Sequence, residues 1–408
     1  MGMRKTGLLL ALGLLSACSG PGATSLTVKL VDGLGEPLQP QAAAWRVGNG
    51  PWSPLPTGQS SWVLPLPAGS GTTFAVGFQC PSTGPLSYVS LEAKRNEVGN
   101  TLLLRCPLDW NSPTGAVSGS TNPAVNGAVF SARGQTALNG GAFSGLTAPV
   151  GAGREVAALG SLGGTTYFGR SGPVTLPSSP NLTLSPTLTL TAATPTGFLS
   201  RAKVYLDTGV RVDLAFWGGG SQTVPRPAPS ALAASELLEI YAEDAPGLAI
   251  LRLANPNPLA APGSTVSLPV PPLSLSVGES HTPTALPTFT FFTGLGSVGF
   301  SAGLNPLGYA LFLAEPGVRY WRHFVGAGAA SSPYTFNLEQ APGFSGVVPI
   351  AGNSVQLCAS AFASDQSLAS FLASRPLPLE SCTCYTLFLD RHHPGRLEVA
   401  KFGFPSTW

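Results

Sequence analysis

Charged residues are scarce in this chain. Lys, Arg, Asp and Glu make up 10% of its 408 residues, whereas ordinary soluble domains contain about 25%. The net charge is +2, and a chain lacking residues 1–17 would have 19 basic and 19 acidic residues. A neutral chain has no electrostatic footprint for nucleic acid. Nucleic acid is therefore not an expected partner, and the surface is expected to consist of uncharged polar residues, Gly and Pro.

Long amphipathic helices and long apolar runs are also missing. Helical periodicity is limited to residues 365–374, with Ser364 or Asp365 as N-cap, and to residues 230–238. The apolar run at residues 7–15 is too short to remain in a bilayer as a spanning helix. The sequence therefore argues against a helical fold and against a retained transmembrane anchor.

The chain contains instead a series of short β patterns. Its 50 Gly and 40 Pro fit either disorder or a turn-rich β protein. Disorder is excluded because apolar residues recur in short runs bounded by turns; Leu26, Val28 and Leu30, for example, alternate with polar neighbours. We therefore expect an all-β fold of tandem antiparallel β-sandwich modules. Comparable runs lie at residues 60–67, 73–80, 101–106, 127–134, 202–209, 248–253, 288–292, 308–315, 385–390 and 397–404.

The N-terminus carries an export pattern. Two basic residues precede the apolar run at 7–15, as in a signal peptide. The sequence Leu15-Ser16-Ala17-Cys18 follows, and it resembles the lipobox of bacterial lipoproteins. The resemblance implies that diacylglycerol is attached to the thiol of Cys18, that the signal peptide 1–17 is cleaved, and that the new amine is acylated.

Membrane lipid is the partner that this resemblance implies. Two or three acyl chains anchor a protein stably, because each buried CH₂ contributes about 0.8 kcal/mol. Ser19, and not Asp, follows the cysteine, and the sorting rule of two-membrane bacteria then favours the outer membrane. Residues 18–25 are expected to form a lipidated, flexible tether. The expected location is extracytoplasmic, with a lipid anchor in the cell membrane or the outer membrane.

Turn-rich and Pro-rich segments divide the remaining chain. They lie near residues 108–114, 185–196 and 273. The apolar runs of 74–104 recur in the same order in 156–184, which indicates two related modules. The expected organisation is a signal peptide (1–17), a tether (18–25), β-sandwich modules at 26–110, 111–190 and 191–273, and a larger C-terminal module at 274–408.

Three segments of the last module have a common pattern. GYALFLAE (308–315), YTFNLEQAPGFSG (334–346) and SVQLCASAF (354–362) match a tyrosine-bearing strand, a following hydrophobic strand and a final strand pair. On these residues the module loosely resembles a fibronectin type III or related immunoglobulin-like module, although the expected helix and the Cys-rich hairpin after it depart from one. The resemblance implies a β-sandwich that binds a ligand or acts as a spacer, and it carries over no catalytic residue.

Disulfides are expected among the cysteines other than Cys18, because they form in exported compartments. Cys80 and Cys106 flank a segment with strand character and are expected to pair within one module. Cys358 is expected to bond either Cys382 or Cys384, and one thiol is then left over. In a strand both members of that close pair share a face, so the sequence leaves the choice open.

One segment has the pattern of an enzyme motif. GLGSVGFSAG (294–303) matches both the dinucleotide-binding and the nucleophile-elbow patterns. Both patterns require a following helix, but Asn305-Pro306 follows here. We therefore expect a Gly-rich hairpin, no enzyme activity and no cofactor, with a serine hydrolase that uses Ser301 as the alternative. The candidate triad residues are Ser301, Asp365 or Asp390, and His392 or His393.

The segment DRHHPGR (390–396) has two interpretations. Pro394-Gly395 predicts an exposed turn. The alternative is a zinc or copper site on a metal-binding surface protein. The Cys-x-Cys spacing, the adjacent histidines and an oxidising compartment argue against a metal, so none is expected. The ligands of that alternative site would be Cys382, Cys384, His392 and His393.

Aromatic residues give the strongest hint of binding. Trp45 and Trp52 bracket a hairpin tip, and the pairs Phe216-Trp217 and Tyr320-Trp321 lie beside Gly or Arg. Exposed rings bind sugars or proteins by stacking and apolar contact, whereas a Trp that fills a sandwich core would not. The acidic residues Glu236, Glu239, Glu243 and Asp244 are expected on a solvated face.

These patterns together favour a membrane-anchored extracytoplasmic lipoprotein. Its expected role in the cell envelope is structural or ligand-binding, with a polysaccharide or a protein as the ligand. No residue pattern in the chain names that ligand.

Overall fold

The computed structural model describes residues 25–66, 69, 71–106, 113–376 and 391–408. Cys18, Cys382, Cys384 and Asp390 lie outside the described residues, as does the strand expected at 385–390. The described chain is all-β, as predicted, and its strands fall into four successive units. We define these as unit 1 (residues 26–105), unit 2 (114–186), unit 3 (188–267) and unit 4 (277–407).

The strands of units 1 to 3 alternate between two packed sheets. Unit 1 contains β1 (Leu26–Val31), β2 (Ala42–Val47), β3 (Ser53–Pro54), β4 (Ser61–Leu64), β5 (Thr73–Cys80), β6 (Leu86–Lys94) and β7 (Thr101–Arg105). Unit 2 contains β8 (Thr114–Asn122), β9 (Asn126–Phe130), β10 (Gln135–Leu138), β11 (Ala142–Pro149), β12 (Gly151–Arg154), β13 (Ala157–Leu162), β14 (Thr165–Arg170), β15 (Val174–Leu176), β16 (Asn181–Thr183) and β17 (Ser185–Pro186). Unit 3 contains β18 (Leu188–Thr194), β19 (Leu199–Tyr205), β20 (Arg211–Trp217), β21 (Gly220–Arg226), β22 (Leu237–Asp244), β23 (Gly247–Ala254) and β24 (Thr265–Ser267).

Units 1 to 3 share one strand topology. In each, the first strand (β1, β8 or β18) lies in the centre of a small sheet. It pairs antiparallel with β4, β11 or β21 and parallel with the last strand, β7, β16 or β24. The opposite sheet of each unit contains an antiparallel series, β2-β5-β6, β9-β13-β14 or β19-β22-β23. The similar runs of 74–104 and 156–184 are therefore equivalent strands, β5 to β7 in unit 1 and β13, β14 and β16 in unit 2.

Unit 4 departs from this topology. Its central strand β26 (Ala285–Phe291) pairs antiparallel with both β25 (Val277–Thr282) and β29 (Tyr334–Thr335). The opposite sheet has the order β28 (Arg319–Gly326), β27 (Asn305–Glu315), β30 (Ser354–Ser364) and β33 (Gly395–Thr407). Residues 334–346, expected to resemble a long hydrophobic strand, form the two-residue β29 followed by the 3₁₀ turn η5 (Leu338–Gln340).

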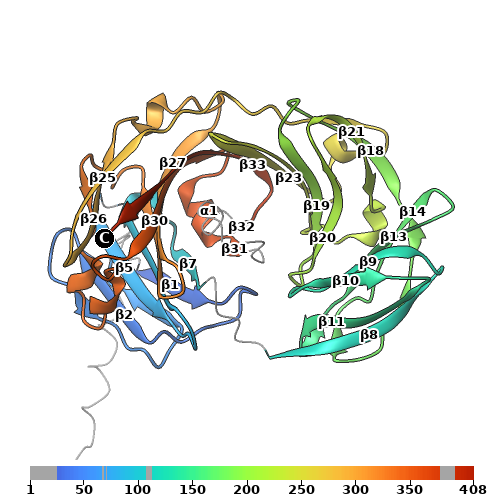
Figure 1. Ribbon diagram of the computed structural model, residues 1–408, viewed down its shortest axis with the longest axis horizontal. Helices are drawn as coiled ribbons and strands as arrows, with labels where there is room; N and C mark the ends of the chain where they lie inside the picture. The colour runs from blue at the N-terminus through green and yellow to red at the C-terminus, as the bar shows by residue number, and fades with distance from the viewer. Residues whose placement is uncertain (1–24, 67–68, 70, 107–112, 377–390) are drawn as a thin grey trace, which may run out of the picture.

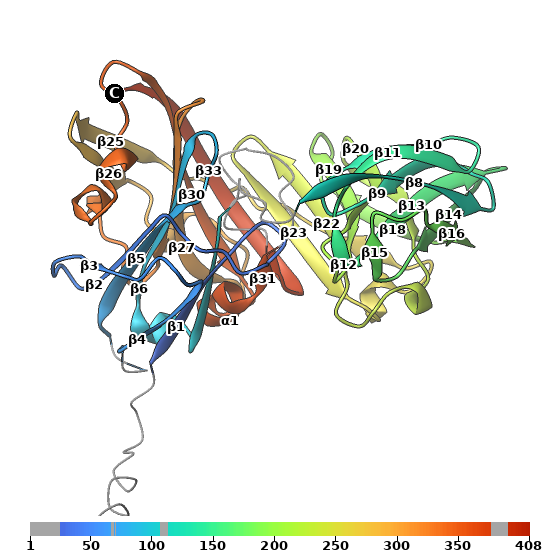
Figure 2. The ribbon, with the colours of Figure 1, turned by 90° about the horizontal axis from the view of Figure 1, so that it is seen from below.

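Units 1, 3 and 4 join edge to edge into a single large sheet. Among the described residues it contains twelve strands, in the order β20-β19-β22-β23-β33-β30-β27-β28-β6-β5-β2-β3. Units 3 and 4 meet through β23 and β33, which are antiparallel, and units 4 and 1 meet through β28 and β6, which are parallel. The sheet bends into an arch (Figure 1). Figure 2 shows β33 and β23 between the two halves of the molecule.

The alternating sequence pattern explains the cores. Leu26, Val28 and Leu30 are fully buried, whereas Lys29 between them is exposed. The pattern places these side chains between the β4-β1-β7 sheet and the large sheet. The predicted disulfide between Cys80 and Cys106 is confirmed and lies in this core. A disulfide that joins two cysteines 26 positions apart stabilises the fold by about 3 kcal/mol in the chain-entropy model.

Of the two expected short helices, one forms and the other does not. The helix α1 (Leu368–Ala373) forms within 365–374, but Ser367, and not Ser364 or Asp365, caps it. The helix expected at 230–238 is wrong: a 3₁₀ turn, η2 (Pro229–Ala231), precedes β22, which starts at Leu237. Pairing of β22 with β19 and β23 overrides the local helical pattern. None of the described helices is long and apolar enough to cross a membrane.

Unit 4 contains an insertion between β30 and β33. Its described parts are α1, β31 (Arg375–Pro376) and β32 (Arg391–His392), which lie inside the arch in Figure 1. The insertion bonds to unit 3, because the guanidinium of Arg375 donates to the Asp207 carbonyl and His392 Nε2 lies 2.8 Å from the Ser235 carbonyl. Units 1 and 2 also meet, through the Arg154–Glu36 ion pair at 3.2 Å.

The parallel junction of units 1 and 4 encloses a buried hydrogen-bond chain. Trp321 Nε1 donates to the hydroxyl of Ser90 at 2.9 Å, and this hydroxyl lies 2.9 Å from Nδ1 of His323. All three residues are fully buried. Burial and the nearby charge of Arg46 hold the pKa of His323 well below its usual value, so the imidazole is neutral and accepts from Ser90 at Nδ1.

The hydrogen-bond chain continues on the other side of the His323 imidazole. His323 Nε2 lies 2.6 Å from the hydroxyl of Tyr334, and this hydroxyl donates to Glu92 at 3.1 Å. Arg46 pairs with the same carboxylate at 3.3 Å. Since Tyr334 donates to Glu92, it accepts from His323, which assigns the imidazole proton to Nε2. Every donor in the chain therefore points the same way, toward Glu92.

Tyr334→Phe should destabilise this junction. The substitution leaves Nε2–H of His323 without its acceptor inside the core, which costs about 1–3 kcal/mol of unfolding free energy. Chemical denaturation measures the loss. The matched control is Tyr309→Phe, which removes a hydroxyl that bonds only to backbone groups, at Thr293 and Leu295, and should cost about 1 kcal/mol. Equal losses of unfolding free energy for the two variants would contradict the hydrogen-bond chain.

Candidate functional site

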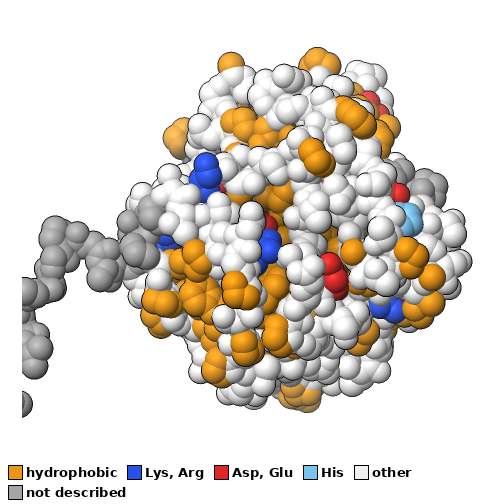
Figure 3. All heavy atoms as spheres, turned by 90° about the vertical axis from the view of Figure 1, so that its left-hand side faces the viewer, with side chains coloured by type: hydrophobic (Ala, Val, Ile, Leu, Met, Phe, Trp, Pro, Cys, Tyr) orange, Lys and Arg blue, Asp and Glu red, His pale blue; other side chains and the backbone are white. Residues whose placement is uncertain are grey.

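The few charged side chains are not spread evenly over the molecule. Figure 3 shows a face of units 1 and 4 on which hydrophobic side chains are scattered among uncharged polar ones, with few charges. The inner side of the arch differs. There the strand register aligns four charged residues of unit 3 across β20, β19, β22 and β23 with alternating sign. In that order the residues are Asp213, Lys203, Glu239 and Arg252.

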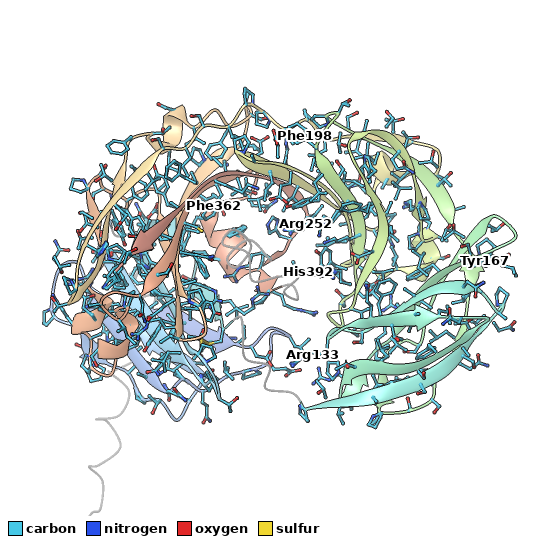
Figure 4. All side chains as sticks on the ribbon, viewed as in Figure 1. Arg133, Tyr167, Phe198, Arg252, Phe362 and His392 are labelled. Carbon is cyan, nitrogen blue, oxygen red and sulfur yellow. A yellow bond between two sulfur atoms is a disulfide. The ribbon has the colours of Figure 1, made fainter. Side chains whose placement is uncertain are left out.

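This charged row is closely packed at its inner end. Arg252 Nε donates to Glu239 at 2.8 Å, and its Nη1 donates to the carbonyl of Arg391 in the insertion at 3.0 Å. Arg252 and His392 both lie within the arch in Figure 4. Glu239, Lys203 and Arg252 are almost fully buried. Opposite charges on neighbouring strands stabilise each other, so this end of the row holds the insertion against the sheet.

A second row lies beside the first and remains open. The guanidinium of Arg201 lies 5.6 Å from the ring centre of Phe216 and 5.9 Å from that of Tyr241, within the range of cation–π attraction. The Tyr241 hydroxyl donates to Glu243, and Lys401 of β33 pairs with that carboxylate. The two rings therefore hold Arg201 in one orientation.

A β-bulge decides which side chains face the arch interior. Asp213 pairs with Lys203 and Ala215 with Ala202, so β20 has one residue more than β19 at this point. Leu214 and Ala215 consequently both pack toward the core of unit 3. Phe216 then faces the interior of the arch, and Trp217 faces the core.

Phe216 is the most prominent feature of this surface, with 66% of its area exposed. It borders a groove of about 380 Å³ whose other lining residues are Arg201, Asp213, Leu214 and Ala215. A volume of this size lies at the lower end of the range for small-ligand sites. We refer to these five residues as the β20 groove. The groove offers an exposed ring, a guanidinium and a carboxylate to a ligand.

The four tryptophans singled out in the sequence lie elsewhere. Trp321 is fully buried and Trp217 nearly so, in the cores of units 4 and 3. Trp45 is half-buried against the core of unit 1. Trp52 is also half-buried, and its Nε1 donates to Asn337 at 3.2 Å. Trp321 thus has no surface for a ligand, and in the pair Phe216-Trp217 the exposed member is Phe216 and not the tryptophan.

The candidate hydrolase residues have other bonding partners. The Ser301 hydroxyl accepts from Arg396 Nη2 at 3.1 Å, and its N–H donates to Glu398 at 2.8 Å. The chain runs from residues 294–303 into strand β27 and not into a helix. His392 and His393 bond to the backbone carbonyls of Ser235 and Pro394. The described contacts therefore give Ser301 a guanidinium as its neighbour in place of a basic imidazole.

Two expectations about exposed polar segments are wrong in part. Glu236 and Glu239 are buried, because Arg170 and Arg252 pair with them at 2.7 and 2.8 Å. The exposed turn expected at 390–396 is wrong in part: Arg391 and His393 are buried under the arch, whereas Pro394, between β32 and β33, is exposed. Burial and the charge of Arg252 lower the pKa of His393 to about 3.

No metal cluster is present within the described ranges. No group of three His, Cys, Asp or Glu side chains there could hold a metal ion. Cys358 is disulfide-bonded, and the cysteines expected to pair with it, Cys382 and Cys384, lie outside the part of the chain that the structure describes. The pairing therefore stays a prediction, and the four-ligand metal site stays the alternative that the sequence disfavours.

Comparisons with known proteins add little. No protein-family model matches the chain, and no curated protein matches it. Two solved structures of the pilus adhesin SpaC from Lactobacillus rhamnosus GG, one in its open conformation, are similar at 12% and 13% identity. The similarity covers 77% and 75% of this chain and 44% and 43% of the adhesin, so this chain spans less than half of its length. The TM-scores, 0.12 and 0.10, are too low to support any conclusion about fold or function.

Proposed function

We propose that this protein is a lipid-anchored extracytoplasmic lipoprotein of the cell envelope that binds a polysaccharide or a protein. The observation that carries the binding role is the β20 groove, where Phe216 is 66% exposed next to Arg201 and Asp213. Phe292 is equally exposed, at 69%, so what distinguishes Phe216 is the groove that it borders and the guanidinium of Arg201 at 5.6 Å from its ring centre. The remainder of the protein positions this site on a rigid arch.

Two further observations support the location. The lipobox-like sequence ends at Cys18, and lipidation there would place the arch at a membrane surface after a short tether. The disulfide between Cys80 and Cys106 is buried in a core. Disulfides of this kind persist in exported proteins and are rare in reducing compartments. Both observations agree with an export route and with display outside the cytoplasm.

Cys18→Ala should abolish the anchor. Without the thiol no diacylglycerol is attached, and the chain should lose its membrane association and keep its signal peptide. Intact mass and N-terminal peptide mapping of protein extracted from membranes measure both effects. Cys358→Ala is the control, because it removes a cysteine without affecting acylation. Wild-type protein with an unmodified Cys18 would contradict the proposed anchor while leaving the groove untouched.

A further inference from the structure

We infer that the β20 groove binds a neutral hexose polymer, with Phe216 as the stacking platform and with Asp213 and Arg201 as hydrogen-bonding groups. This inference rests on the proposed binding function and names its ligand class. Four features of the groove support it: the exposed ring of Phe216, the polar pair beside that ring, the balance of charge and the size of the site.

The ring of Phe216 meets the first requirement of a sugar site. It stands on a strand of the large sheet, so its position is fixed by the backbone pairing of Phe216 with Arg201. The apolar C–H face of a pyranose covers an aromatic ring by stacking, and this removes apolar area from water on both sides. Arg201 lies over the ring at 5.6 Å, and the exposed fraction of 66% leaves most of the side chain's area available to such a ligand.

The polar pair meets the second requirement. Asp213 pairs with Arg211 at 3.6 Å through Oδ1, and its carboxylate also accepts from sugar hydroxyls, while Arg201 carries N–H donors in a planar fork. The rings of Phe216 and Tyr241 hold the guanidinium, so little side-chain entropy is lost when a ligand binds. The bulge at Leu214–Ala215 places the carboxylate and the ring on one face of β20.

Charge balance favours a neutral ligand over an acidic one. The groove lining contains one guanidinium and one carboxylate, whose formal charges cancel, and Arg211, which pairs with that carboxylate at 3.6 Å, does not line the groove. A uronate or phosphate polymer would gain from Arg201 but would be repelled by Asp213 at the same site. A neutral hexose has hydroxyls that serve both groups, because each hydroxyl donates and accepts.

The size of the site favours a sugar over a protein. Specific protein interfaces bury about 800 Å² on each partner and use about 20–30 residues a side. The β20 groove is lined by five residues and contains one exposed ring. A volume of about 380 Å³ instead suits a small ligand, or a short stretch of a polymer that passes through the groove.

The experiment uses full-length protein purified from membranes in detergent. It is applied to an array of neutral gluco-, manno- and galacto-oligosaccharides and of oligogalacturonates, and the hits are then titrated by calorimetry. We expect binding to at least one neutral hexo-oligosaccharide. Phe216→Ala should weaken it about tenfold, and Asp213→Asn should weaken it as well. The affinity should change less than about twofold between 50 and 500 mM NaCl, because no net charge is neutralised.

Phe292→Ala is the matched control. Phe292 is 69% exposed but lies in unit 4, away from the groove lining, so its loss should leave the affinity unchanged. Binding of only the oligogalacturonates, no neutral binding on the array, or equal losses for the two Phe variants would each overturn the inference. These outcomes leave the state of Cys18 unaffected, so they are distinct from failure of the lipid anchor.

Discussion

Arg170→Met should lower the free energy of unfolding by about 3–5 kcal/mol. Arg170 of unit 2 lies between two fully buried carboxylates, Glu155 at 2.5 Å and Glu236 of unit 3 at 2.7 Å. Burial alone would lower the pKa of Arg170, but the hydrogen bonds and charges of the two glutamates raise it. Removing the cation leaves two like charges in the core without a counterion. Chemical denaturation monitored by fluorescence measures the loss.

Two further variants separate charge from packing. Lys29→Met removes an exposed cation and should change stability by less than about 0.5 kcal/mol. A triple variant, Arg170→Met with Glu155→Gln and Glu236→Gln, removes all three charges and should recover part of the lost stability, because neutral amides cost less to bury. If the triple variant were less stable than Arg170→Met, the buried charges would not be the cause.

Acid should unfold this protein more steeply than its few titratable groups suggest. The pKa of His323, of His392 and of His393 is lowered by burial in the folded state. Below pH 6.5 the unfolded chain binds protons at these histidines and the folded chain does not. Stability therefore falls as the pH decreases from 6.5 toward the folded-state pKa values, by up to about 4 kcal/mol per pH unit for three protons.

The carboxyl groups oppose this trend in part. Burial raises the pKa of Glu92 and of Glu339, so the folded state gains protons there at a higher pH than the unfolded state. Their effect has the opposite sign just above pH 4.5 and flattens the curve at that end. The measurement is urea denaturation at intervals between pH 7.5 and pH 4.5.

His393→Phe tests whether His393 contributes to the acid sensitivity. The ring packs edge-on against Phe371, and a phenyl group retains this contact without binding a proton. The slope of stability against pH should decrease by about 1.4 kcal/mol per pH unit, the value for one proton, while stability at pH 7.5 should change little. An unchanged slope would show that His393 does not contribute to the acid sensitivity.

Local alternation explains why much of the fold could be predicted. Short apolar runs with period two, such as that of β1, specify a strand and its buried face without reference to the rest of the chain. The segments that separate unit 1 from unit 2 and unit 3 from unit 4 could also be predicted from the local sequence, because they are rich in turn residues. The expected boundary near 190 instead falls inside β18 (Leu188–Thr194), a strand that pairing with β21 and β24 defines.

The candidate site could not be predicted for a specific reason. Strict alternation from Val212 points Trp217 to the surface and Phe216 to the core. The bulge at Leu214–Ala215 inverts both, and nothing in the residues of β20 indicates it. Glu236 and Glu239 were misplaced for a similar reason. Their partners Arg170 and Arg252 lie on other strands, and an acid is expected on the surface unless its counterion is known.

The twelve-stranded sheet has a consequence for how the chain folds. The sheet joins unit 1 to unit 3 through unit 4, so neighbours in the sheet are distant in the chain; Ser90 of β6 and His323 of β28 are 233 residues apart. Such a high contact order slows folding, because a long loop must close before any contact forms. During synthesis from the N-terminus, the β6 edge stays unpaired until residues 319–326 emerge. The arch is complete only when β33, at residues 395–407, pairs with β23, and until each junction closes an open strand edge is available for aggregation.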